Sequence, residues 1–104
     1  MKECPVTRAW KIIGRPWRLV IIDRLLAKPR TFNELIESMP GISTRTLTKA
    51  LSELKRLGII EKVYDGKRHY YALTDAGKDL SNVVKNVREW SEKWLLPKEQ
   101  KTVI

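Results

Sequence analysis

The fold is decided by residues 31–57, TFNELIESMPGISTRTLTKALSELKRL. Thr31 and Glu34 have the spacing of a helix-capping box, and apolar residues follow at helical spacing: Phe32, Leu35, Ile36 and Met39. Pro40-Gly41 predicts a tight turn, because proline stops a helix and glycine adopts positive φ at no steric cost. Ser43 is then a suitable N-cap for a second helix, whose apolar residues share one face: Leu47, Ala50, Leu51, Leu54 and Leu57. The stretch therefore predicts two helices joined by a short turn.

The opposite face of the second helix is predicted to be polar and basic. At about 100° per residue, Arg45, Lys49, Ser52 and Arg56 fall within about 60° of one another, with Thr48 beside them. Short hydroxyl side chains stand at the start of the same helix: Ser43, Thr44 and Thr46. A solvated helix face carries this pattern too, so the stripe alone does not establish a ligand.

Two strand-like runs follow, over residues 59–64 and 67–73, on either side of Asp65-Gly66. This dipeptide favours a hairpin with a two-residue loop, which would pair Tyr64 with Lys67, Lys62 with His69 and Ile60 with Tyr71. The apolar base of such a hairpin packs on the helices, while Lys67 and Arg68 project at its tip. Those two cations serve either to contact a polyanion or to keep an exposed hairpin soluble.

Helical segments are expected on both sides of this body. A short helix over residues 6–13, ended by Gly14, precedes a buried apolar helix over residues 17–27 with Pro16 in its first turn. After the hairpin, Thr74 caps a last helix. A chain of 104 residues is expected to form one domain. Its predicted parts are an N-terminal arm (1–14), a body (16–74), a C-terminal helix (75–96) and a tail (97–104).

The last helix carries an apolar stripe: Leu80, Val83, Val84, Val87, Trp90 and Trp94. The stripe belongs either to the core of the chain or to an interface between chains. Two large tryptophans near the end of a small domain exceed what one core readily absorbs, and aromatic anchors are enriched in interfaces. We therefore expect a twofold dimer in which Trp10 and Ile13 of the first helix take part.

Charge and composition limit the classes of function that the chain can have. The chain has 21 basic and 12 acidic side chains, and residues 1–74 hold 15 of the basic and 7 of the acidic ones. A basic body suggests a polyanionic partner. No apolar run is long enough to span a bilayer and no secretion signal is apparent, so we expect a cytoplasmic protein without membrane contact. Cys4 and His69, the single cysteine and histidine, cannot form a metal cluster, and we expect neither a metal nor another cofactor.

The order of helix, turn, basic helix and hairpin predicts a winged helix-turn-helix, a mainly α fold with a small β-hairpin. Several motifs, spanning about residues 4–94, resemble the HxlR-type transcription regulators, relatives of the MarR group. They are Cys4-Pro5-Val6, Gly14-x-x-Trp17, PRTFNEL (29–35), PGIS (40–43), LGIIEK (57–62) and YALTDAG (71–77). The sequence departs from the family in its short wing, residues 65–68, and in Thr44, where proline is frequent.

This resemblance implies a homodimeric, cytoplasmic DNA-binding regulator with dimerisation helices at both ends. In that family an N-terminal cysteine at the place of Cys4 often senses oxidants or electrophiles. The residues by themselves leave two interpretations of Cys4 open, a reactive thiolate near Arg8 or a small packed hydrophobe.

The leading hypothesis is a homodimer that binds a pseudo-palindromic sequence in double-stranded DNA. Arg45 is the first candidate for a base contact, Lys49 and Ser52 come next, and Arg56 is expected to meet phosphate. The full predicted contact set is Ser43, Thr44, Arg45, Thr46, Thr48, Lys49, Ser52, Arg56, Lys67 and Arg68. The alternative is a winged-helix module that docks on another protein without sequence-specific DNA binding. The sequence has no phosphate loop, nucleophile elbow or histidine-containing triad, so we do not expect an enzyme.

Overall fold

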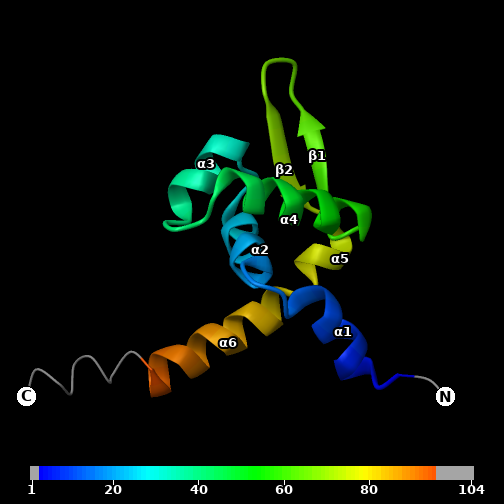
Figure 1. Ribbon diagram of the computed structural model, residues 1–104, viewed down its shortest axis with the longest axis vertical. Helices are drawn as coiled ribbons and strands as arrows, with labels where there is room; N and C mark the ends of the chain where they lie inside the picture. The colour runs from blue at the N-terminus through cyan, green and yellow to red at the C-terminus, as the bar shows by residue number, and fades with distance from the viewer. Residues whose placement is uncertain (1–2, 96–104) are drawn as a thin grey trace, which may run out of the picture.

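The computed structural model describes residues 3–95. Its elements run in the order α1 (Pro5–Ile13), α2 (Arg18–Ala27), α3 (Phe32–Ser38), α4 (Thr44–Arg56), β1 (Ile60–Tyr64), β2 (His69–Leu73), α5 (Asp75–Lys78) and α6 (Ser81–Trp94). The hairpin projects from one end of the molecule beside α3 and α4, and α1 and α6 diverge at the other end (Figure 1). The predicted mainly α fold with a small antiparallel hairpin is confirmed. Residue 96 of the predicted last helix and the predicted tail, 97–104, lie outside the described residues.

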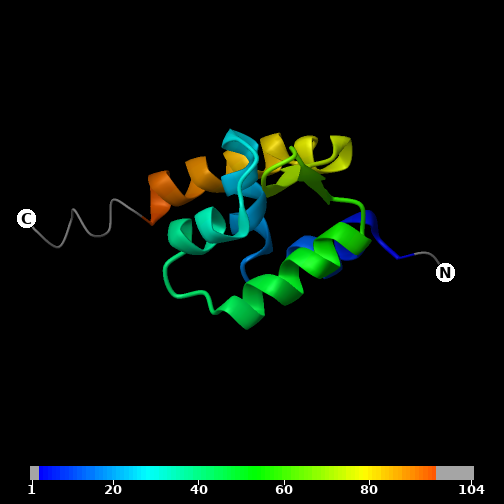
Figure 2. The ribbon, with the colours of Figure 1, turned by 90° about the horizontal axis from the view of Figure 1, so that it is seen from above.

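The core is built around α2, the most apolar helix of the sequence. Ile21 and Ile22 are fully buried, and α2 lies between α4 and α6 (Figure 2). Other core side chains come from α3, α4, the hairpin and α6: Leu35, Met39, Leu47, Ala50, Leu51, Leu54, Ile59, Ile60, Leu73 and Val84. None of the helices described within residues 3–95 is long and apolar enough to cross a membrane.

The helix-turn-helix forms as its local signals predict. The Glu34 backbone N–H donates to Thr31 Oγ1 (3.2 Å), and the Thr31 N–H donates to Glu34 Oε1 (2.8 Å), which completes the capping box. Gly41 has φ of 96°, the positive value that the turn requires. Ser43 Oγ accepts the Thr46 N–H at 3.0 Å and caps α4.

The predicted hairpin register is wrong by two residues. Tyr64 pairs with His69, Lys62 with Tyr71 and Ile60 with Leu73, so the loop has four residues, 65–68. The Asp65 carboxylate accepts the N–H groups of Lys67 and Arg68, both at 2.9 Å, which stabilises this longer turn. A shift of two leaves each side chain on its predicted face, because side chains alternate with a period of two.

A single bridge ties the hairpin to the linker between α2 and α3. The Arg30 N–H donates to the Tyr71 carbonyl (3.0 Å), and the Tyr71 N–H donates to the Arg30 carbonyl (2.8 Å). These two bonds fix the base of the hairpin against the helical body.

The predicted continuous helix over residues 75–96 is also wrong, because it is broken between α5 and α6. A Cβ at Gly77 would lie 2.4 Å from the Ile59 carbonyl oxygen, so α5 lies in close contact with the base of the hairpin. Thr74 caps α5 through the Gly77 N–H (3.3 Å) and donates its hydroxyl to the Gly58 carbonyl (2.6 Å). The chain then turns at Leu80, and α6 packs on α2 through Val84.

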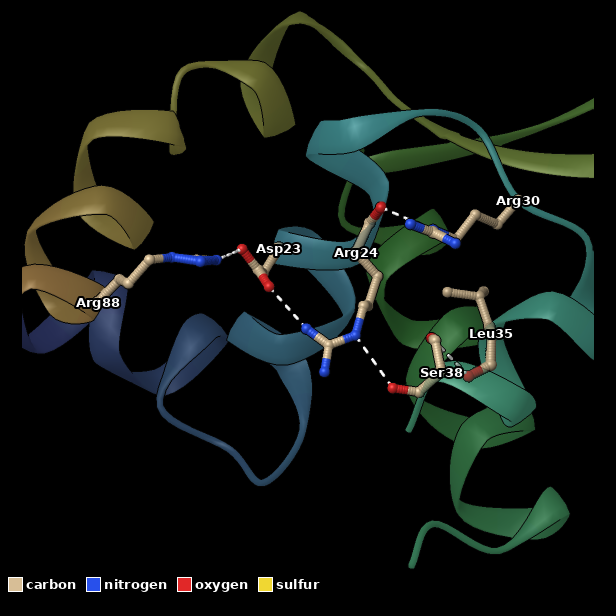
Figure 3. Close-up of polar contacts among 6 residues, drawn as sticks. All are labelled: Asp23, Arg24, Arg30, Leu35, Ser38 and Arg88. Atoms are coloured by element: carbon tan, nitrogen blue, oxygen red, sulfur yellow. Dashed lines mark hydrogen bonds and ion pairs between the residues drawn. The ribbon is translucent and has the colours of Figure 1, made fainter. Parts of the chain in front are cut away.

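Polar contacts join α2 to its neighbours (Figure 3). Asp23 forms ion pairs with Arg88 of α6 and with Arg24, whose Nη1 lies 2.7 Å from Asp23 Oδ2. Arg24 Nε donates to the Ser38 carbonyl at the end of α3 (3.1 Å), and Arg30 Nε donates to the Arg24 carbonyl (2.9 Å). These contacts connect α6, α2 and α3.

Candidate nucleic-acid interface

Helix α4 separates its residues into an apolar face and a basic face. The apolar face is buried, and every predicted contact residue of this segment is exposed: Ser43, Thr44, Arg45, Thr46, Thr48, Lys49, Ser52 and Arg56. Two hydroxyls bond locally, Ser43 Oγ to Thr46 Oγ1 and Thr48 Oγ1 to the Thr44 carbonyl, both at 2.8 Å. Within residues 3–95, the ion pairs leave Arg45, Lys49 and Arg56 without a carboxylate partner. The basic face can therefore meet an external polyanion.

The wing presents two more cations. Lys67 and Arg68 are exposed in the four-residue loop. Their backbone N–H groups donate to the Asp65 carboxylate, and these bonds, led by the one from Arg68, lower the pKa of Asp65. Asp65 is thus the residue that orders the loop carrying both predicted wing contacts.

A buried arginine of α2, Arg18, joins α4 to the rest of the helical body. Arg18 is 3% exposed, and its Nη2 donates to Glu53 Oε1 at 2.5 Å. Its Nη1 donates to the Ile12 carbonyl at 2.7 Å, so one side chain links α1, α2 and α4. The hydrogen bond from Arg18 lowers the pKa of Glu53, which keeps this carboxylate ionised. Our sequence analysis missed this pair, although Arg18 opens an apolar run and Glu53 is the only carboxylate of α4.

The predicted interface stripe divides between the core and the surface. Val84 is 8% exposed and Leu80 packs against the core, so we assign these two side chains to the interior of the chain. Ile13 is half-buried. Large apolar side chains of α1, of α6 and of its C-cap residue do face solvent: Val6, Trp10, Val83, Val87, Trp90, Trp94 and Leu95. Val6 and Leu95 were not part of the predicted stripe.

Cys4 is exposed and precedes the first residue of α1. The backbone N–H groups of Thr7 and Val6, in the first turn of that helix, stabilise its thiolate and lower the pKa of Cys4. Its exposure argues against the alternative of a buried small hydrophobe.

A helix-turn-helix followed by a wing, with an exposed basic second helix, defines the winged-helix class of DNA-binding proteins. The profile described as HxlR-like helix-turn-helix matches residues 12–99, and the chain belongs to this family. It is therefore a transcriptional regulator of the helix-turn-helix type.

Sequence relatives and solved structures agree with this assignment. The chain is 35% identical over 94 residues to the Bacillus subtilis HTH-type regulator YdeP, covering 88% of this chain and 73% of YdeP. It spans 58% of the length of a Mycobacterium tuberculosis regulator to which it is 33% identical. The reduced form of B. subtilis YodB superimposes with a TM-score of 0.78 at 29% identity, over 92% of this chain and 98% of YodB. The redox regulator HypR in its reduced form superimposes with a TM-score of 0.81 at 29% identity, over 93% of this chain and 99% of HypR.

Proposed function

We propose that this protein acts in the cytoplasm as a homodimer that binds a pseudo-palindromic operator in double-stranded DNA. The observation that carries the proposal is the exposed basic face of α4, on a helix whose other face is buried in the core. An α-helix fits the major groove, and a twofold dimer would present two copies of α4 about 34 Å apart on one side of the duplex.

The contact residues divide by role. Arg45, near the start of α4, contacts a base edge, and Lys49 and Ser52 extend the contact along the groove. Arg56, near the end of the helix, meets a phosphate, and Lys67 and Arg68 of the wing contact the neighbouring backbone or minor groove. The short residues Ser43, Thr44, Thr46 and Thr48 allow α4 to approach the bases.

The dimer interface is proposed to use the exposed apolar residues of the terminal helices. Within residues 3–95, α1 contributes Trp10 and α6 contributes Val83, Val87, Trp90 and Trp94, with Ile13 at the edge. Large apolar side chains that are left exposed in clusters are typical of interaction sites on soluble proteins, and both terminal helices carry such side chains.

Cys4 is the proposed sensor of oxidants or electrophiles. The similar protein HypR is called a redox regulator, and YodB has been solved bound to quinone and after diamide treatment. The thiolate of Cys4 would add to a ring carbon of a quinone, forming an S–C bond while the displaced π electrons and a proton pass to the quinone oxygen. Its exposure and lowered pKa support this role.

DNA binding is tested with two duplexes, one selected by the wild-type protein from a randomised pool and one of mixed sequence. Affinity for both should fall steeply with salt, with a slope of about −0.9 per neutralised phosphate in a plot of log K against log salt. Arg45→Ala should remove the preference for the selected duplex. An unchanged preference would remove Arg45 from the base-reading role. Folded protein that is not retained by DNA at low salt would favour a protein-docking module instead.

A further inference from the structure

A cationic cleft opens beside α4, on the side of the turn between α1 and α2. It has a volume of about 360 Å³, and its charged lining consists of Arg15 of the turn, Arg18 of α2, and Arg45, Lys49 and Glu53 of α4. Arg45 and Lys49 are one helical turn apart, so both side chains lie on the same side of α4. The cleft therefore continues the basic face of α4 onto a second element.

The one carboxylate of the cleft does not oppose an entering anion. Glu53 is paired with Arg18, whose buried guanidinium uses Nη2 for this contact and Nη1 for the Ile12 carbonyl. The charge left for an external ligand comes from Arg15, Arg45 and Lys49, all three exposed. Three cations around an open cleft produce a local positive potential that suits a phosphate group.

Arg15 is held at the rim of the cleft while most of its donors remain available. Its Nε donates to the Lys11 carbonyl at 3.4 Å, a long and weak bond that leaves the two terminal nitrogens for an external ligand. A guanidinium offers five N–H donors in a planar fork, and its two terminal nitrogens match the oxygens of a phosphate.

We propose that this cleft binds a backbone phosphate of the duplex that α4 reads, and that Arg15 is a DNA contact outside the predicted set. The inference rests on the proposed function. A helix that enters the major groove has the phosphates of the groove wall beside it, and a residue of a neighbouring turn can hold one of them. Contacts of this type fix the orientation of the protein on the duplex and carry no base preference.

The test compares Arg15→Gln with Arg15→Lys, using the selected and mixed-sequence duplexes across a range of salt concentrations. Arg15→Gln should weaken binding to both duplexes by the same factor. It should also make the slope of log K against log salt shallower by about 0.9 for each cleft that binds a phosphate, which is about 1.8 for a dimer. Arg15→Lys keeps a point charge and should retain most of the slope. Lys85→Gln is the matched control, because it removes one exposed cation from α6, on the opposite side of α2 from α4 (Figure 2).

The outcomes separate this inference from the function on which it rests. If Arg15→Gln keeps the wild-type slope while Arg45→Ala still loses the preference for the selected duplex, the cleft is not a phosphate site but the regulator function stands. If Arg15→Gln changes the preference between duplexes, Arg15 reads bases and the phosphate assignment is overturned. If the folded wild-type protein binds neither duplex, the proposed function itself fails and this inference fails with it.

Discussion

Replacing Trp90 by alanine should weaken dimerisation strongly. Trp90 is 57% exposed on α6, so about 140 Å² of a tryptophan surface of ~250 Å² is available to a partner. At about 25 cal/mol per Å², complete burial of that area contributes roughly 3.5 kcal/mol for each copy. A twofold interface contains the residue twice, so the loss is roughly 7 kcal/mol for full burial and about half of this for half burial. The dissociation constant of the dimer should therefore rise by a factor between about 300 and about 10⁵.

Sedimentation equilibrium over a wide range of protein concentration measures this change directly. Tyr64→Ala is the matched control, because Tyr64 is an aromatic residue of similar exposure, 59%, that lies on the wing. Its truncation should leave the dimer constant unchanged. Circular dichroism should show that Trp90→Ala keeps its helices, since the side chain lies outside the core. A Trp90→Ala constant within threefold of the wild-type value would refute the assignment of α6 to the dimer interface.

Three further predictions concern the supporting structure. In urea unfolding, Glu53→Ala should destabilise the protein more than Arg18→Met, because the Glu53 side chain is 30% exposed and can hydrate when unpaired, whereas the Arg18 side chain is 4% exposed and cannot. The double variant should recover part of the stability lost in Glu53→Ala, and strictly additive effects would contradict this. The hydrogen bonds that lower the pKa of Asp65 stabilise the wing at pH values above the pKa of this carboxyl in the unfolded chain, and their contribution should disappear as the pH falls through the lower pKa of the folded state. The amide NMR shifts of Lys67 and Arg68 should follow this titration in the wild type and not in Asp65→Ala, and either failure would contradict the prediction. Gly77→Ala should destabilise by roughly 1–3 kcal/mol in the same urea assay, because its Cβ would meet the Ile59 carbonyl oxygen; unchanged stability would mean that α5 can move away from the hairpin.

The helix-turn-helix was predicted correctly from local sequence patterns. The bonds between Thr31 and Glu34 and the cap at Ser43 involve residues three apart, so the sequence contains both partners within one turn. The two faces of α4 follow from helical periodicity, which does not depend on the rest of the chain. The exposure of all its predicted contact residues was therefore predictable from the sequence.

The errors arose where contacts between distant residues decide the structure. Asp65-Gly66 is compatible with loops of two and of four residues, and the structure has the longer loop, with the strand after it paired to Arg30 through Tyr71. The break between α5 and α6 follows directly on α5, where Gly77 lies against Ile59, eighteen positions earlier. Neither partner can be recognised from its own neighbourhood in the sequence.

The interface stripe shows the same limit. Leu80, Val83, Val84 and Val87 have the spacing of one helical face, yet Val84 is buried in the core while Val83 and Val87 are exposed. Periodicity identifies an apolar face but not what covers it. Because α6 packs on α2 along only part of that face, the division between core and surface depends on the tertiary arrangement.

The arrangement of α2 connects the proposed dimer interface to the proposed DNA surface. A dimer can set the distance between two copies of α4 only if each copy is rigidly joined to the terminal helices. Arg18, in the first turn of α2, bonds both the end of α1 and Glu53 of α4. Between one and two turns further on, Asp23 pairs with Arg88 of α6, and the adjacent Arg24 donates to the Ser38 carbonyl at the end of α3 (Figure 3). With Ile21, Ile22 and Leu25 buried in the core, α2 thus holds the terminal helices and the helix-turn-helix in one body. In the proposed dimer, the way the two α6 helices pack against each other would therefore determine where the two α4 helices lie.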